Sequence, residues 1–285
     1  MKQQIELIEC PRDAMQGWKH FIPTETKIAY LNQLLKCGFD VLDFGSFVSP
    51  KAIPQLADTK EVLRQLDLST TSTKLLAIIA NTRGAEEGVV YDEIHYLGFP
   101  FSISETFQLR NTNKTIAQSL AQVEEIQTLC TKHQKELVIY ISMGFGNPYN
   151  DPYNAEVAIN WVHQLSQLGI HNFAMSDTVG VAKPDIIHSI FEHLLREFPH
   201  LHIGAHFHST PTTWEEKIQA AYHSGCRRYD SALKGIGGCP MAADELTGNI
   251  ATENILGWCA QQNIPLNINK EAFAEAMMMA GSVFV

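Results

Sequence analysis

Short apolar stretches alternate with longer amphipathic ones along almost the whole chain. Eight of the apolar stretches have the length and composition of buried strands, and they cover residues 5–10, 41–44, 74–80, 93–97, 137–142, 172–176, 201–207 and 227–232. Strands that alternate with helices pair in parallel, because a helical crossover returns the chain to the same edge. The pattern therefore predicts an α/β protein made of eight strand–helix units.

Three of the intervening stretches show helical periodicity clearly. The first has Thr24 as its predicted N-cap, Gly38 as its stop, and one apolar face formed by Ile28, Leu31, Leu34 and Leu35. The second spaces its apolar residues by three or four between Ile116 and Leu129, and the third opens at Pro184. Eight such units are typical of a (β/α)8 TIM barrel. We expect one domain over residues 1–285, with a helical extension at the C-terminal end.

The amino-acid composition bears on which kinds of molecule the protein could bind. The 285 residues include 45% apolar and 18% charged side chains, and the net charge is −10, from 21 basic and 31 acidic residues. This balance argues against nucleic acid or an anionic membrane surface as a partner. The six cysteines form no Cys-x-x-Cys pair, and no stretch has the form of a signal peptide or a membrane span. We therefore expect reduced thiols and a cytoplasmic location.

Two histidines one residue apart, His206 and His208, lie at the end of the seventh predicted strand. Alternate side chains of a strand share a face, so both imidazoles could reach one metal ion, although buried histidines also serve structural roles. Asp13 ends the first strand and Asn249 follows the last. Nitrogen and oxygen donors in this combination suit Mg²⁺ or Mn²⁺, with Co²⁺ or Zn²⁺ as alternatives. A closed barrel would bring these residues to one mouth, whereas an open doubly wound sheet need not.

Several motifs carry a resemblance to a known family. They are CPRDAMQ at 10–16, SFVSPK at 46–51, SDTVG at 176–180, AHFH at 205–208, GIGGCP at 235–240 and GNIATE at 248–253. In this order they resemble the 3-hydroxy-3-methylglutaryl-CoA (HMG-CoA) lyases, a family of metal-dependent carbon–carbon lyase and synthase barrels. The GIGGCP motif is the most specific of them for lyases over the related synthases.

The resemblance implies cleavage of HMG-CoA, or a close 3-hydroxyacyl-CoA, to acetyl-CoA and acetoacetate by retro-Claisen type chemistry. It implies an acyl-CoA as the partner and leaves a homodimer open. The implied metal ligands are Asp13, His206, His208 and Asn249. The implied catalytic residues are Arg12, Asp43, Asp177 and Cys239, and the implied substrate-binding residues are Arg12, Gln16, Lys19 and Thr178.

The chain departs from the family pattern at several positions. Cys10 and Ala14 stand where the family usually has glycine, Asp43 replaces a glutamate, and Ser209 replaces an acid or amide. The stretch 241–247 is one residue longer and carries two acidic residues. Two other functions stay open: an aldolase or condensing synthase acting on 2-oxo acids, and a barrel that binds metal or acyl-CoA without turnover. The synthases usually have a further C-terminal domain, which this sequence of 285 residues does not show.

Overall fold

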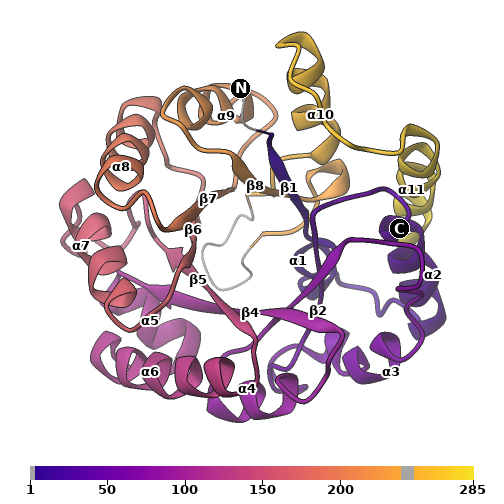
Figure 1. Ribbon diagram of the computed structural model, residues 1–285, viewed down its shortest axis with the longest axis horizontal. Coiled ribbons are helices and arrows are strands. Elements are labelled where there is room, and N and C mark those ends of the chain that lie inside the picture. Colours follow the sequence, from indigo (N-terminus) through magenta and orange to yellow (C-terminus); the bar gives the residue numbers. More distant parts are fainter. Residues whose placement is uncertain (1–3, 239–246) are drawn as a thin grey trace.

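Eight parallel strands close into a barrel in a computed structural model, which describes residues 4–238 and 247–285 (Figure 1). Each strand pairs with the next, and the first pairs with the last, with Leu7 opposite Tyr229. The strands are β1 Glu6–Glu9, β2 Val41–Ser46, β3 Lys74–Ile78, β4 Ile94–Ser102, β5 Glu136–Ser142, β6 Asn172–Asp177, β7 His202–Phe207 and β8 Arg228–Ser231. The predicted TIM barrel is confirmed, and the open sheet is excluded.

Helices surround the strands on the outside (Figure 1). They are α2 Thr24–Leu35, α3 Thr59–Leu63, α4 Thr82–Gly88, α5 Glu105–Thr112, α6 Ile116–Lys132, α7 Ala155–Ser166, α8 Pro184–Glu197 and α9 Trp214–His223. The short helix α1 (Pro11–Gln16) instead lies inside this ring, at the end of β1. Two more helices, α10 (Thr252–Gln261) and α11 (Lys270–Val283), form the predicted extension, and α11 packs against α2. Among the described residues, no helix combines the length and apolarity that a membrane crossing requires.

Two local predictions are wrong in detail. Thr24 is not an N-cap: it is the first residue of α2, and its hydroxyl donates a hydrogen bond to Asp58 Oδ2 at 2.8 Å. Strand β4 was expected to end at Leu97 but continues to Ser102, through Pro100. Glycine and proline usually mark the end of a strand, and Gly98 and Pro100 therefore hid this extension in the sequence.

The apolar core has two parts. The larger part lies between the strands and the helices, and the smaller fills the barrel with side chains from alternate strand positions, among them Ile8, Val41, Leu76, Val138 and Ala174. One side of the barrel interior is charged instead, because Arg228 enters it from β8. An added Cβ at Gly204 would lie 2.7 Å from Arg228 Nη1, so this glycine makes room for the guanidinium.

Candidate metal centre and active site

Three buried ligand groups meet at the carboxyl end of the barrel. One ligand atom each from Asp13, His206 and His208 lies within 4.8 Å of the others. Asp13 belongs to α1, which follows β1 directly, while His206 lies in β7 and His208 just beyond it. Because β1 and β7 both border β8, barrel closure brings them together. The predicted convergence of the early aspartate with the two histidines is therefore present.

His208 is held with one ring nitrogen directed at this cluster. Its Nδ1 bonds the backbone oxygen of Thr178 at 3.0 Å, while its buried Nε2 has no hydrogen-bond partner among the described residues. Burial and the neighbouring His206 lower the pKa of His208 to about 4, so the ring is neutral at pH 7. A neutral imidazole with an unpaired nitrogen has the form of a metal ligand.

His206 is oriented by a carboxylate that the sequence analysis missed. Its Nδ1 lies 3.1 Å from Asp230 Oδ2, and Arg228 Nη1 lies 3.3 Å from the other oxygen of Asp230. Burial alone would lower the pKa of His206, but the hydrogen bond and charge of Asp230 raise it above its ordinary value. A bond from Nδ1–H to a carboxylate leaves Nε2 as the coordinating atom, an arrangement that metal-binding histidines commonly use.

Asn249 reaches the cluster through the chain that follows β8. Its amide nitrogen donates to Asp13 Oδ2 at 2.6 Å and to the backbone oxygen of Ile236 at 3.0 Å, so neither bond uses its amide oxygen. Its backbone forms an antiparallel bridge with His208. Burial would raise the pKa of Asp13, but Arg12 and the two histidines lower it to about 2. Asp13 is therefore an ionised oxygen donor.

Arg12 links the cluster to Asp43 of β2. Its Nε and Nη2 donate to Asp43 Oδ2 at 2.9 and 2.6 Å, and its Nη1 donates to Asp13 Oδ1 at 3.1 Å and to Gln16 Oε1 at 2.9 Å. Burial raises the pKa of Asp43 to about 6 although Arg12 opposes that shift. The guanidinium is thus fixed beside the proposed ligands, and Gln16 helps to hold it.

Asp177 does not join this group. Its carboxylate accepts hydrogen bonds from Lys217 Nζ at 2.6 Å and from the backbone nitrogens of Val181 and Ala182 at 2.8 and 3.1 Å. The neighbouring Thr178 contributes its backbone oxygen to His208, and its hydroxyl accepts a bond from the Met143 nitrogen at 2.8 Å. Both residues therefore brace the site from the side of β6.

A hollow of about 400 Å³ lies beside the cluster. Its wall contains Trp18, Lys19 and His20 together with Ile236, Gly237 and Gly238. The hollow is next to the proposed ligands, since an added Cβ at Gly237 would lie 2.5 Å from Asn249 Nδ2. Lys19 therefore lines a space that opens near Asp13. Cys239, the next residue after Gly238, lies outside the described residues.

The donor set fits a divalent cation. Two imidazole nitrogens, an ionised carboxylate and an amide oxygen are a mixed set that magnesium, manganese and later first-row ions accept. The unpaired Nε2 of His208 supports this reading directly. Cys10, His206 and Asp230 form a second group within 4.8 Å. Burial raises the pKa of the Cys10 thiol well above its ordinary value, so that thiol is neutral and a weak ligand.

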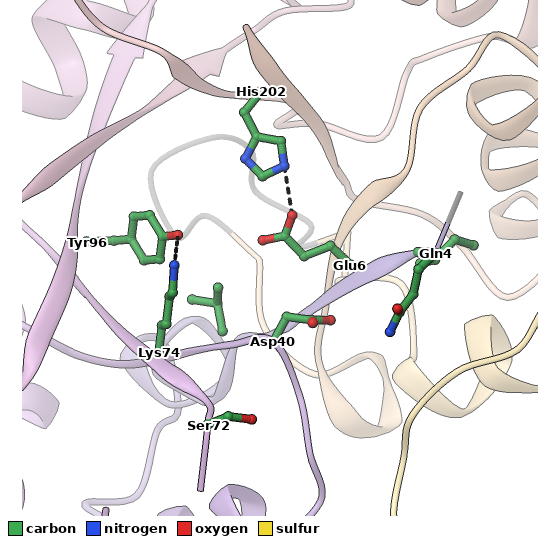
Figure 2. A pocket seen from close by; sticks show the side chains of 9 residues that line it. Gln4, Glu6, Asp40, Ser72, Lys74, Tyr96 and His202 are labelled. Carbon is green, nitrogen blue, oxygen red and sulfur yellow. Dashed lines mark hydrogen bonds and ion pairs between the residues drawn. The ribbon is translucent and has the colours of Figure 1, made fainter. Parts of the chain in front are cut away.

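A second hollow, of about 450 Å³, lies at the opposite end of the barrel (Figure 2). His202 Nε2 lies 2.8 Å from Glu6 Oε2, and Lys74 Nζ donates to the Tyr96 hydroxyl at 3.2 Å. Asp40 accepts a bond from the Leu7 nitrogen at 2.8 Å. The amino ends of TIM-barrel strands generally contribute to stability and not to chemistry, and these pairs agree with that role.

Comparison with known proteins gives consistent results. The family model described as HMGL-like matches residues 5–279. Hydroxymethylglutaryl-CoA lyase YngG of Bacillus subtilis is 33% identical over 93% of this chain and 88% of its own length. A 3-hydroxy-3-isohexenylglutaryl-CoA/hydroxymethylglutaryl-CoA lyase of Pseudomonas aeruginosa is 30% identical, over 97% of this chain and 91% of its own length.

Solved structures extend the comparison to three dimensions. An HMG-CoA lyase from Acinetobacter baumannii, in complex with coenzyme A and 3-methylmalate, superposes with a TM-score of 0.91 at 32% identity and covers 99% of this chain and 91% of its own. The carboxyl transferase domain of Rhizobium etli pyruvate carboxylase has a TM-score of 0.72 at 14% identity, covering 98% of this chain and 47% of its own, which shows a shared fold alone.

Proposed function

This chain belongs to the HMGL-like family, and from that membership we propose that it is a divalent-metal-dependent lyase that cleaves HMG-CoA to acetyl-CoA and acetoacetate. The observation that carries the proposal is the convergence of Asp13, His206 and His208 within 4.8 Å. These groups lie at the carboxyl end of the strands, where TIM-barrel enzymes have their active sites. We propose Mg²⁺ or Mn²⁺ as the ion, with Asn249 as the fourth protein ligand.

The reaction breaks the bond between C2 and C3 of the acyl group. The C3 hydroxyl loses its proton and becomes the ketone of acetoacetate, while the electron pair of the broken bond passes to C2 as the enolate of acetyl-CoA. Asp13, His206, His208 and Asn249 would hold a divalent cation, whose Lewis acidity would make this hydroxyl more acidic. The enolate then takes a proton at C2 and leaves as acetyl-CoA.

Arg12 is proposed to stabilise the negative charge that develops on the thioester oxygen. Its guanidinium is fixed before substrate arrives, because Asp43, Asp13 and Gln16 accept hydrogen bonds from it. Preorganised charge of this kind is a large contribution to catalysis, since the site need not rearrange as the charge forms. Asp43 is proposed to serve catalysis by fixing Arg12, because both of its oxygens accept hydrogen bonds from the guanidinium.

The remaining roles concern substrate placement and protonation. Lys19 lines the hollow beside the cluster, and we propose that its ammonium meets the phosphates of coenzyme A. Cys239 is proposed to donate the proton to C2 of the enolate. Asp177, by contrast, is proposed to support the site indirectly, because its oxygens already accept bonds from Lys217 and two backbone nitrogens.

One assay tests the proposal. The metal-free protein is mixed with HMG-CoA, with and without Mg²⁺ or Mn²⁺, and acetoacetate is measured. Release of acetoacetate only when metal is present supports a lyase. Condensation of acetyl-CoA with a 2-oxo acid in parallel reactions would indicate a synthase instead. Tight binding of acyl-CoA with no product in either reaction would indicate a barrel without turnover.

A further inference from the structure

A buried lysine lies behind the proposed metal centre. Lys217 is on α9, and only 1% of its surface is exposed. Its ammonium donates to Asp177 Oδ2 at 2.6 Å, to the backbone oxygen of His208 at 2.8 Å and to that of Gly180 at 3.0 Å. Three acceptors use all three protons of the ammonium group. The lysine is therefore fixed in position.

These bonds hold His208 from both ends of the residue. Lys217 binds its backbone oxygen, and Thr178 binds its ring at Nδ1 through a backbone oxygen, 3.0 Å away. Thr178 is itself fixed, because the preceding residue, Asp177, is bonded to Lys217 and to the loop that follows. The ion pair of Lys217 with Asp177 thus helps to fix both the ring and the backbone of His208.

We propose that Lys217 is a positioning residue of the metal centre, which fixes His208 so that its Nε2 faces Asp13 and His206. This inference rests on the proposed function, in which His208 binds a divalent cation. Buried ion pairs contribute little net stability, because desolvation offsets their attraction. Stability alone therefore does not explain this buried ion pair, whereas the positioning of His208 does.

The chain offers a matched control for a purely structural role. Lys27 of α2 is also 1% exposed, and it pairs with Asp58 at 2.9 Å. Its other hydrogen bond is to the backbone oxygen of Gln55. Neither Asp58 nor Gln55 is a proposed metal ligand. Loss of either lysine removes a buried cation from an aspartate, but only loss of Lys217 removes a bond to His208.

The experiment measures Mn²⁺ binding to metal-free protein by calorimetry and by the paramagnetic resonance signal of the free ion. Lys217→Met should weaken Mn²⁺ binding by about 10- to 100-fold, the usual effect of losing a group that orients a ligand. Lys27→Met should bind Mn²⁺ as the wild type does. Equal, wild-type affinity in both variants would overturn the inference, and so would an equal loss in both.

A double variant separates geometry from folding. Lys217→Met combined with Asp177→Asn leaves no uncompensated buried charge, so it should regain much of the stability that the single change loses. It still lacks a donor to the His208 backbone oxygen, so its Mn²⁺ affinity should stay low. Recovery of affinity together with stability would refute a positioning role. Failure of the wild type to bind Mn²⁺ would instead overturn the metal centre, and this inference with it.

Discussion

Replacing Arg12 by glutamine tests the central catalytic assignment. The change removes a guanidinium that forms ion pairs of 2.6 Å with Asp43 and 3.1 Å with Asp13. If that cation stabilises the enolate, its loss costs roughly 3–4 kcal/mol in the transition state, which lowers kcat by about 10²–10³-fold. Binding of Mn²⁺ should not weaken, because Arg12 competes with a cation for Asp13 Oδ1.

The assay follows acetoacetate release at saturating Mn²⁺ and compares it with the Mn²⁺ dissociation constant of the metal-free protein. Removing one partner from buried carboxylates also costs about 3–5 kcal/mol of stability, so urea denaturation must show that the variant is folded. Arg12→Lys is the control, because it keeps one positive charge but cannot span Asp43 and Asp13 together. Its kcat should lie between those of the wild type and Arg12→Gln. A wild-type kcat for Arg12→Gln would refute the reasoning.

Four further changes test other parts of the site. His208 has a pKa of about 4 in the folded protein and of about 6.5 in the unfolded chain. The metal-free protein should therefore lose roughly 3 kcal/mol of stability as the pH falls from 6.5 to 4. Urea denaturation should show a smaller loss in His208→Gln, and an equal loss would contradict the assignment. Gly204→Ala brings a methyl group to 2.7 Å from Arg228 Nη1 and should lower the free energy of unfolding by about 1–3 kcal/mol, whereas an unchanged urea midpoint would mean that Arg228 moves freely. Lys19→Ala should raise KM for HMG-CoA and leave Mn²⁺ affinity as it is; a constant KM would make Lys19 an ordinary surface lysine. Cys239→Ser should keep Mn²⁺ affinity but slow turnover, and unchanged kinetics would exclude the thiol as the proton donor.

The periodic part of the structure could be predicted from the sequence. Apolar runs gave the eight strands, and helices between them implied closure, which in turn brought Asp13 to His206 and His208. The limits of β4 could not be seen, because Gly98 and Pro100 disrupt the strand pattern while the neighbouring strand β5 still pairs with them.

The supporting residues of the site were missed for a different reason. Arg228 and Asp230 stand two apart in a strand that otherwise read as buried, and charges on one face of a buried strand are a signal that could have been used. Lys217 gave no such signal, because a lysine on an amphipathic helix is usually solvated. Its proposed role depends on the neighbouring ends of β6 and β7, which place Asp177 and the His208 backbone around one ammonium group.

The backbone bridge between His208 and Asn249 makes binding of the proposed ion depend on closure of the β-barrel. Asn249 also bonds Asp13, a residue 236 positions earlier in the chain, so two of the proposed ligands meet only once β8 has joined β1. An unfolded or half-wound chain holds these donors apart and has little affinity for the ion. Binding of the proposed ion would therefore favour the closed barrel by mass action, by about 2.7 kcal/mol at a hundred times its dissociation constant. Mn²⁺ added to the metal-free protein would thus raise its urea midpoint as well as its activity.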